Sequence, residues 1–192
     1  MLTFMSRVKN FLLIGSNGNL VLGQHWTIHD VVTDSLHTVS GFSNTSDIDA
    51  QVLKIAKHPD IKNPDGSIVP NIQSSGWKND ANKNLPGLKK LYETYPDANW
   101  FMMIDDDTYV FVDNLVDYLS TLDPQTPYYI GRANSFVGCA GIVNHGDGPE
   151  FAHGGSGYVV SKKAMSMLLD GYNACIEKHS SCWAGDIRVA LW

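Results

Sequence analysis

Three consecutive aspartates, Asp105, Asp106 and Asp107, directly follow the apolar run at residues 100–104. Adjacent carboxylates repel one another and are costly to leave beside a protein core, so a compensating positive charge is expected. Carboxylate oxygens are typical ligands of hard divalent cations such as Mg²⁺ or Mn²⁺. The pattern predicts a buried strand, although periodicity alone also fits a buried helix segment. A metal is expected at the carboxyl end of the strand, which is where open α/β sheets bind ligands.

The acidic run could instead be a solvated turn, the commonest fate of such a cluster. The apolar run in front of it and an apolar helical stripe behind it favour a metal or metal–nucleotide site. A calcium loop of the EF-hand kind is excluded, because Tyr109 and Val110 occupy its fifth and sixth places, where a ligand and a glycine are needed.

A glycine-rich segment and a later carboxylate are further candidates for a site. Gly154, Gly155 and Gly157 would allow the backbone to approach a substrate closely, although a flexible turn is the simpler interpretation. The segment fits neither a Walker loop nor a dinucleotide fingerprint. Asp186 could be a helix N-cap, or a general base that points into the same cleft.

Trp77, Asp80 and Lys83 are spaced so that they could share one helical face. They could be ligand contacts, or an exposed polar face with one buried tryptophan. The seven histidines show no spacing typical of a metal site, and His145 and His153 are interpreted as loop residues.

Apolar periodicity predicts strands that alternate with helices. The expected strands are residues 11–14, 31–34, 100–104, 128–130 and 158–160. Helices are expected from about residues 46, 84, 112 and 161, the last with Ser161 as its N-cap. Loops are expected at 59–70 and 175–185. This alternation indicates a single α/β domain with a largely parallel sheet.

The composition is that of a folded globular protein of 192 residues, enough for one domain with a core. With 20 acidic and 14 basic residues the net charge is −6, so nucleic acid and anionic membrane surfaces are not expected partners. The apolar run at 11–14 is too short to span a bilayer. Cys175 and Cys182 could close a short loop and leave Cys139 free, or all three could be cytosolic thiols.

Taken together, these segments resemble the Fringe and core 1 β-1,3-galactosyltransferase family, glycosyltransferase family 31, whose members have a GT-A fold. Residues 100–110, WFMMIDDDTYV, resemble the DxD region of the family, and residues 154–162, GGSGYVVSK, resemble its GGAGYVLSK segment. Between them, YIGR at 129–132 is similar to the family's YFGR. Residues 175–186 are similar to the stretch before its Glu-Asp pair, and residues 76–86 resemble the fungal-type branch.

The resemblance implies an inverting transfer of a hexose, of the galactose or N-acetylglucosamine class, from a UDP-sugar to a hydroxyl of a glycan or glycoprotein. Asp107 would be the leading ligand of Mn²⁺ or Mg²⁺, Asp105 would lie toward the ribose and uracil and assist with the metal, and Asp106 would support the site. Asp186, which matches the second acid of the Glu-Asp pair, would accept the proton of the acceptor hydroxyl. The residues expected to line the donor and acceptor cleft or to contact the donor are Gly154, Gly155, Gly157, Trp77, Asp80 and Lys83.

The sequence also departs from the family pattern. Gly185 stands where the family has the first acid of its Glu-Asp pair, and Asn17 stands where it has an acid that touches the nucleotide. The resemblance implies an N-terminal membrane anchor and a metal-binding histidine beyond the position of Trp192, and neither is visible in these 192 residues. We therefore expect a domain that is incomplete at both ends, from a type II membrane protein of the Golgi lumen. The alternative is a non-catalytic relative that retains a nucleotide- or carbohydrate-binding cleft.

Overall fold

The central sheet has three strands, each antiparallel to its neighbour. A computed structural model describes residues 4, 7–15, 20–22, 26–32 and 80–192. In it, β8 (Tyr158–Ser161) lies between β4 (Trp100–Met103) and β5 (Tyr129–Gly131). All four residues of β8 are buried, as expected for a strand with neighbours on both edges and helices packed against it. Because β4 leads directly to the aspartates, this sheet positions the acidic turn.

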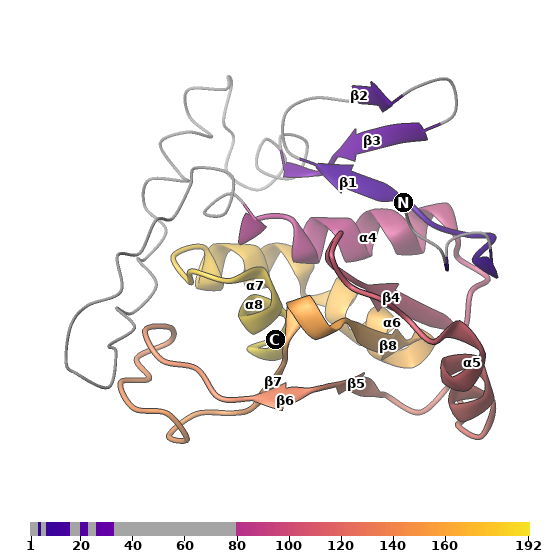
Figure 1. Cartoon of the computed structure of the whole chain (residues 1–192). Helices are drawn as coiled ribbons and strands as arrows, with labels where there is room; N and C mark the ends of the chain where they lie inside the picture. The colour runs from indigo at the N-terminus through magenta and orange to yellow at the C-terminus, as the bar shows by residue number, and fades with distance from the viewer. Residues whose placement is uncertain (1–3, 5–6, 16–19, 23–25, 33–79) are drawn as a thin grey trace, which may run out of the picture.

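Four helices pack around this sheet (Figure 1). They are α4 (Asn84–Thr94), α6 (Lys162–Asp170), α7 (Tyr172–His179) and α8 (Gly185–Ala190). Their apolar faces and the inner strands form the main core, which is Leu85, Leu88, Phe101, Ala152, Tyr158, Val160, Met165, Leu168, Tyr172, Cys175, Ile176 and Val189. A further helix, α5 (Val112–Ser120), follows the acidic turn.

The N-terminal strands form a second small sheet on the other side of α4 (Figure 1). Strand β1 (Leu13–Gly15) pairs in parallel with β3 (Trp26–Asp30), which pairs antiparallel with β2 (Leu20–Leu22). A Cβ at Gly87 of α4 would lie 2.5 Å from Ile14 Cδ1 and 3.0 Å from the methyl carbon of Met103. Glycine at this position therefore lets α4 lie close to both sheets.

A smaller core lies under the long loop between β6 (Ala133–Asn134) and β7 (Phe151–Ala152), which pair antiparallel. Its buried residues are Phe136, Cys139, Phe151, Cys182 and Ile187. Cys139 and Cys182 form a disulfide across 43 residues. The sequence left the pairing open between a Cys175–Cys182 bond and three thiols, and the structure has neither: Cys175 is a free thiol buried in the main core.

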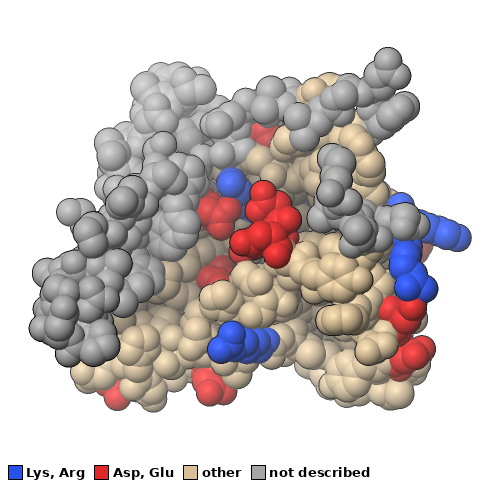
Figure 2. Space-filling view, viewed as in Figure 1, with Lys and Arg blue, Asp and Glu red and all other residues tan. Residues whose placement is uncertain are grey.

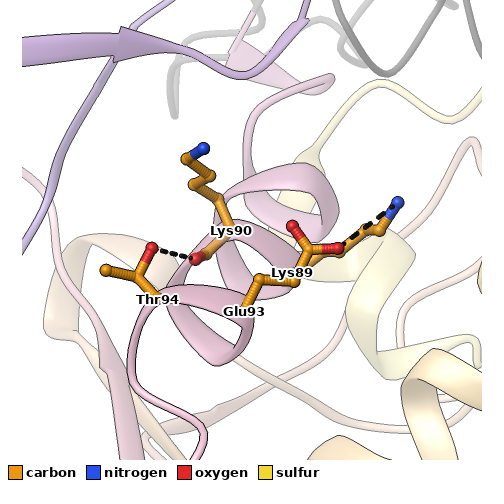
Figure 3. A network of polar contacts seen from close by, with 4 residues as sticks. All are labelled: Lys89, Lys90, Glu93 and Thr94. Atoms are coloured by element: carbon orange, nitrogen blue, oxygen red, sulfur yellow. Dashed lines mark hydrogen bonds and ion pairs between the residues drawn. The ribbon is translucent and has the colours of Figure 1, made fainter.

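The exposed face of α4 carries the charges expected of an amphipathic helix, as Figure 3 shows. Lys89 Nζ lies 3.8 Å from Glu93 Oε1, one helical turn away, and Thr94 Oγ1 donates to the Lys90 carbonyl at 2.7 Å. Lys89 Nζ also lies 4.8 Å from the ring centre of Tyr172. Within the part of the chain that the structure describes, no helix is long and apolar enough to cross a membrane.

The predicted strands at 100–104, 128–130 and 158–160 are confirmed as β4, β5 and β8, and three predicted helices are confirmed as α4, α5 and α6. Ser161 is the N-cap of α6, because its Oγ accepts from the Ala164 amide at 3.2 Å. The predicted helix from residue 46 and loop at 59–70 lie outside the described residues.

Three predictions need correction. The sheets are not largely parallel: among the described strand pairings, only β1–β3 is parallel and the other four are antiparallel. The expected loop at 175–185 begins within α7, whose buried residues follow the helical spacing i, i+3, i+4, i+7: Tyr172, Cys175, Ile176 and His179. Of the strand expected at residues 31–34, only Val31 and Val32 lie in the described part; they are buried just after the end of β3 and belong to no strand.

Candidate functional site

The acidic turn begins two residues after the last residue of β4. Asp105, Asp106 and Asp107 are all exposed, and the amide of Thr108 closes the turn by donating to the Asp105 carbonyl at 3.2 Å. The Thr108 hydroxyl donates to the Gly155 carbonyl at 3.1 Å. The turn is thereby attached to a segment 47 residues further along the chain.

That segment is the glycine loop, residues 154–157, which joins β7 to β8. Its first three residues form a 3₁₀ turn, η2 (Gly154–Ser156). The Gly154 amide donates to Asp186 Oδ2 at 2.7 Å. A Cβ at position 154 would lie 3.1 Å from the same oxygen, and one at position 155 would lie 3.5 Å from Asp105 Oδ2. The glycine loop is therefore next to both carboxylates.

Gly157 makes the transition from this loop to β8. Its φ of +74° and ψ of 149° belong to a region that residues with a side chain rarely adopt. A Cβ there would also lie 2.9 Å from the methyl carbon of Met102 and 3.0 Å from Ile104 Cγ2. Gly157 is thus required by backbone conformation and by close packing against the end of β4.

Asp186 lies in the first turn of α8 and is half-buried. Its Oδ1 accepts from the Ile187 amide at 2.8 Å, while its Oδ2 faces Gly154. Burial raises the pKa of the Asp186 carboxyl, and the two amide hydrogen bonds and the charge of His153 act in the opposite direction. Both oxygens are thus oriented by backbone amides.

The electrostatic surroundings of Asp105 are strongly negative. Partial loss of solvent around its carboxyl is the main factor that raises its pKa, although the residue as a whole is exposed. The charges of Asp80, Asp107, Asp186 and Asp106 raise it further. Figure 2, viewed as Figure 1 is, shows acidic side chains gathered near the middle of the visible face of the molecule, next to a basic side chain. This field would attract a cation.

Asp80 and Lys83 lie at the edge of this field, in a turn before α4. The Lys83 amide donates to the Asp80 carbonyl at 2.9 Å, and Lys83 Nζ lies 3.1 Å from Asp80 Oδ1. The turn keeps the two side chains together. Trp77 lies outside the described residues.

The acidic turn provides part of a site for a divalent cation. Among the described residues, no three His, Cys, Asp or Glu side chains converge closely enough to hold a metal ion by themselves. The chemistry still fits, because Mg²⁺ is commonly held by one or two carboxylates together with ligand phosphates. The exposed aspartates and the negative field at Asp105 provide that kind of partial site.

His153 was predicted to be a loop residue, and the structure places it within the site. It directly precedes the glycine loop, and its Nδ1 lies 3.5 Å from Ser156 Oγ. A Cβ at Gly155 would lie 3.0 Å from His153 Cε1. Its charge acts on Asp186. Its position next to the glycines was the one sequence signal that could have identified it.

Gly185 is packed against α4. A Cβ at this position would lie 2.5 Å from Asn84 Nδ2, and Asn84 Oδ1 accepts from the Tyr158 hydroxyl at 2.6 Å. A larger residue at 185 would require this buried amide to move. The missing acid of the Glu-Asp pair thus coincides with a close contact between α8 and α4.

The comparison with known families gives the context for this arrangement. Residues 42–189 match the Fringe-like family, a span that includes the acidic turn, the glycine loop and Asp186. The chain belongs to the Fringe-like family. The predicted resemblance is thereby confirmed at the level of the family.

Curated relatives of this Fringe-like chain are glycosyltransferases. It is 32% identical over 85 residues to glycoprotein-N-acetylgalactosamine 3-beta-galactosyltransferase 1 of Xenopus laevis, which is 44% of this chain and 21% of that protein. It is 32% identical over 79 residues to human chondroitin sulfate glucuronyltransferase, 41% of this chain and 10% of that protein. It is 26% identical over 98 residues to human chondroitin sulfate synthase 3, 50% of this chain and 11% of that protein. The chain thus spans at most about a fifth of the length of these relatives.

Proposed function

We propose that this Fringe-like chain is a GT-A-type glycosyltransferase domain, which transfers a hexose from a UDP-sugar to a hydroxyl of a glycan or glycoprotein with inversion. The observation that supports this most directly is the position of the glycine loop, between Asp186 and the acidic turn. The Gly154 amide donates to Asp186 at 2.7 Å, and the Gly155 carbonyl accepts from Thr108 at 3.1 Å. A donor group and a proton acceptor could therefore be held on the two sides of one short backbone segment.

On the donor side, Asp107 would bind a divalent cation, Asp105 would lie toward the nucleoside and share the cation, and Asp106 would support the turn. Bound there as Mn²⁺ or Mg²⁺, the cation would neutralise charge on the leaving diphosphate. Asp80, Lys83 and Trp77 would make further contacts with the donor.

On the acceptor side, Asp186 would accept the proton of the attacking hydroxyl while the new bond to the anomeric carbon forms and the bond to the diphosphate breaks. A raised pKa makes a carboxylate a better proton acceptor near neutral pH, and burial raises the pKa of Asp186. The Gly154 and Ile187 amides keep this carboxylate in one orientation and leave other lone pairs available. Gly154, Gly155 and Gly157 would let the sugar approach the backbone.

The disulfide is in keeping with an oxidising compartment, and we place the proposed activity in the Golgi lumen.

Binding of UDP tests the donor half of the proposal. Calorimetry with the full chain should show binding that depends on Mn²⁺ and that is lost in Asp107→Ala. The matched control is Asp117→Ala, an exposed acid on α5, which should bind as the unmodified protein does. Equal UDP binding with and without Mn²⁺ would contradict the metal role of Asp107.

Transfer tests the acceptor half. Asp186→Asn should keep UDP and Mn²⁺ binding and lose transfer or UDP-sugar hydrolysis by about 10²-fold or more, the usual contribution of a general base. Binding without any turnover in the unmodified protein would instead favour a non-catalytic relative with a nucleotide-binding cleft.

A further inference from the structure

Arg188 is a buried charged residue two positions after Asp186, on the same helix, α8. Only 4% of its surface is exposed. Its guanidinium makes four hydrogen bonds of 2.7 to 3.0 Å, which go to the Ser180 carbonyl, to Asn82 Oδ1 and twice to the Cys182 carbonyl. In the described part of the chain no carboxylate forms an ion pair with it.

The acceptors belong to two other parts of the fold. Ser180 and Cys182 lie at and just beyond the C-terminal end of α7, where helix carbonyls lack partners within their own helix. Asn82 lies in the turn that carries the Asp80–Lys83 ion pair. The planar fork of arginine can serve all of these acceptors at once, whereas the single ammonium of lysine cannot.

Helix α8 depends on such contacts for its position. It has six residues, and its N-cap residue, Ala184, makes no side-chain cap hydrogen bond. A helix of this length is not stable by itself, so its place is determined by packing and by bonds to its neighbours. Burial lowers the pKa of Arg188 to about 10, so the guanidinium remains charged at neutral pH and keeps all its donors.

We propose that Arg188 is a positioning residue, which holds α8 so that the Asp186 carboxylate stays on the Gly154 amide. Its bond to Asn82 also couples α8 to the turn that carries Asp80, whose charge acts on Asp105. The two sides of the site are thereby connected beneath the surface. Only the naming of Asp186 as the proton acceptor rests on the proposed function; the positioning itself does not.

Amide hydrogen exchange, measured by NMR, follows the positioning without any assay of activity. In Arg188→Met the Gly154 amide should lose at least about tenfold of its protection, the effect of losing one hydrogen bond to a charged acceptor. The amides of β8 should keep theirs. Arg188→Lys should show the same local loss. Lys178→Met, an exposed basic residue on α7, is the matched control and should change neither.

Variants at Asn82 decide the matter if Arg188→Met fails to fold. Asn82→Leu removes the acceptor and keeps the volume, so it should lower protection of the Gly154 amide. Asn82→Asp keeps an acceptor for the guanidinium and should preserve that protection. Unchanged Gly154 exchange in folded Arg188→Lys and Asn82→Leu would overturn the proposal, as would an equal loss at Gly154 and throughout β8.

Kinetics separate this proposal from the proposed function. If the chain transfers sugar, Arg188→Lys should lower kcat with little change in the KM for the donor, because Asp186 acts on the acceptor side. If the unmodified chain shows no transfer, the proposed activity fails, and the exchange experiment still tests the positioning role.

Discussion

At the scale of single residues, the site is governed by opposing influences on Asp186. Burial raises the pKa of its carboxyl, while the Gly154 and Ile187 amides and the charge of His153 lower it. The pKa of Asp186 therefore depends on the neighbouring His153 as well as on burial and the backbone. His153 thus lowers the pKa of the Asp186 carboxyl.

His153→Ala should move the acidic limb of the pH–rate profile to higher pH. Asp186 must be ionised to accept a proton, so the rate rises as pH passes upward through its pKa. Removal of the positive charge of His153 takes away an influence that lowers this pKa, so the limb shifts upward. The measurement is kcat/KM for transfer against pH.

His145→Ala is the matched control, because His145 is exposed and contacts Ser135 in the long loop. It should leave the profile unchanged. A limb that stays in place or moves to lower pH in His153→Ala would show that His153 does not act on Asp186 in this way.

At the scale of elements, the junction of the glycine loop with β8 determines how the two carboxylates are spaced. Gly157 connects the loop to a strand that pairs with β4 on one side and β5 on the other. Because β4 leads to Asp105 and the loop touches Asp186, a shift at Gly157 would change both sides of the site.

Gly157→Ala should be clearly more destabilising than Gly146→Ala. Both positions have positive φ, +74° and +91°, so both should lose about 1–3 kcal/mol to backbone strain. At Gly146 a Cβ would meet no atom within 4 Å, whereas at Gly157 it would meet Met102 and Ile104. Overpacking should add about 1–3 kcal/mol at Gly157 alone. Urea unfolding measures the free energy of unfolding of both variants. Equal losses of stability would show that the contacts around Gly157 relax freely.

Elements with strong local patterns could be predicted from the sequence, and relations between elements could not. The strand at 158–160 and the Ser161 N-cap of α6 were predicted because a short apolar run and a capping serine are local signals. The direction of the strands was not predicted correctly, because the alternation of strands and helices along the chain does not specify which strands pair. Helix α7 had the buried spacing of a helix, but its cysteine and polar residues resembled a loop.

The site shows the same division. The acidic turn and the glycine loop were recognisable as motifs, and Asp186 as a single carboxylate. The bond from Gly154 to Asp186 joins residues 32 apart, and that from Asn82 to Arg188 joins residues 106 apart. Contacts at such separations depend on how α4, α8 and β8 pack together, which no local pattern contains.

At the scale of the whole molecule, one covalent bond joins the long loop after β6 to the segment that leads to α8. Cys139 and Cys182 lie in the smaller core with Ile187, the residue whose amide donates to Asp186. The disulfide therefore restrains the end of the fold that carries Asp186 as well as the loop. Cys175, buried in the main core, takes no part in it.

Reduction of this disulfide should lower the free energy of unfolding by roughly 2–4 kcal/mol, because the unfolded chain regains the freedom of a long loop. The bond closes 43 residues, whereas a Cys175–Cys182 bond would close only a short loop. Cys139→Ala should therefore make stability insensitive to reductant, while Cys175→Ala should keep the sensitivity. Denaturant unfolding with and without reductant measures the stability of both variants. Peptide mapping of the oxidised chain identifies the bonded cysteines. Insensitivity of Cys175→Ala, with sensitivity retained in Cys139→Ala, would contradict the pairing and with it the attachment of the loop to α8.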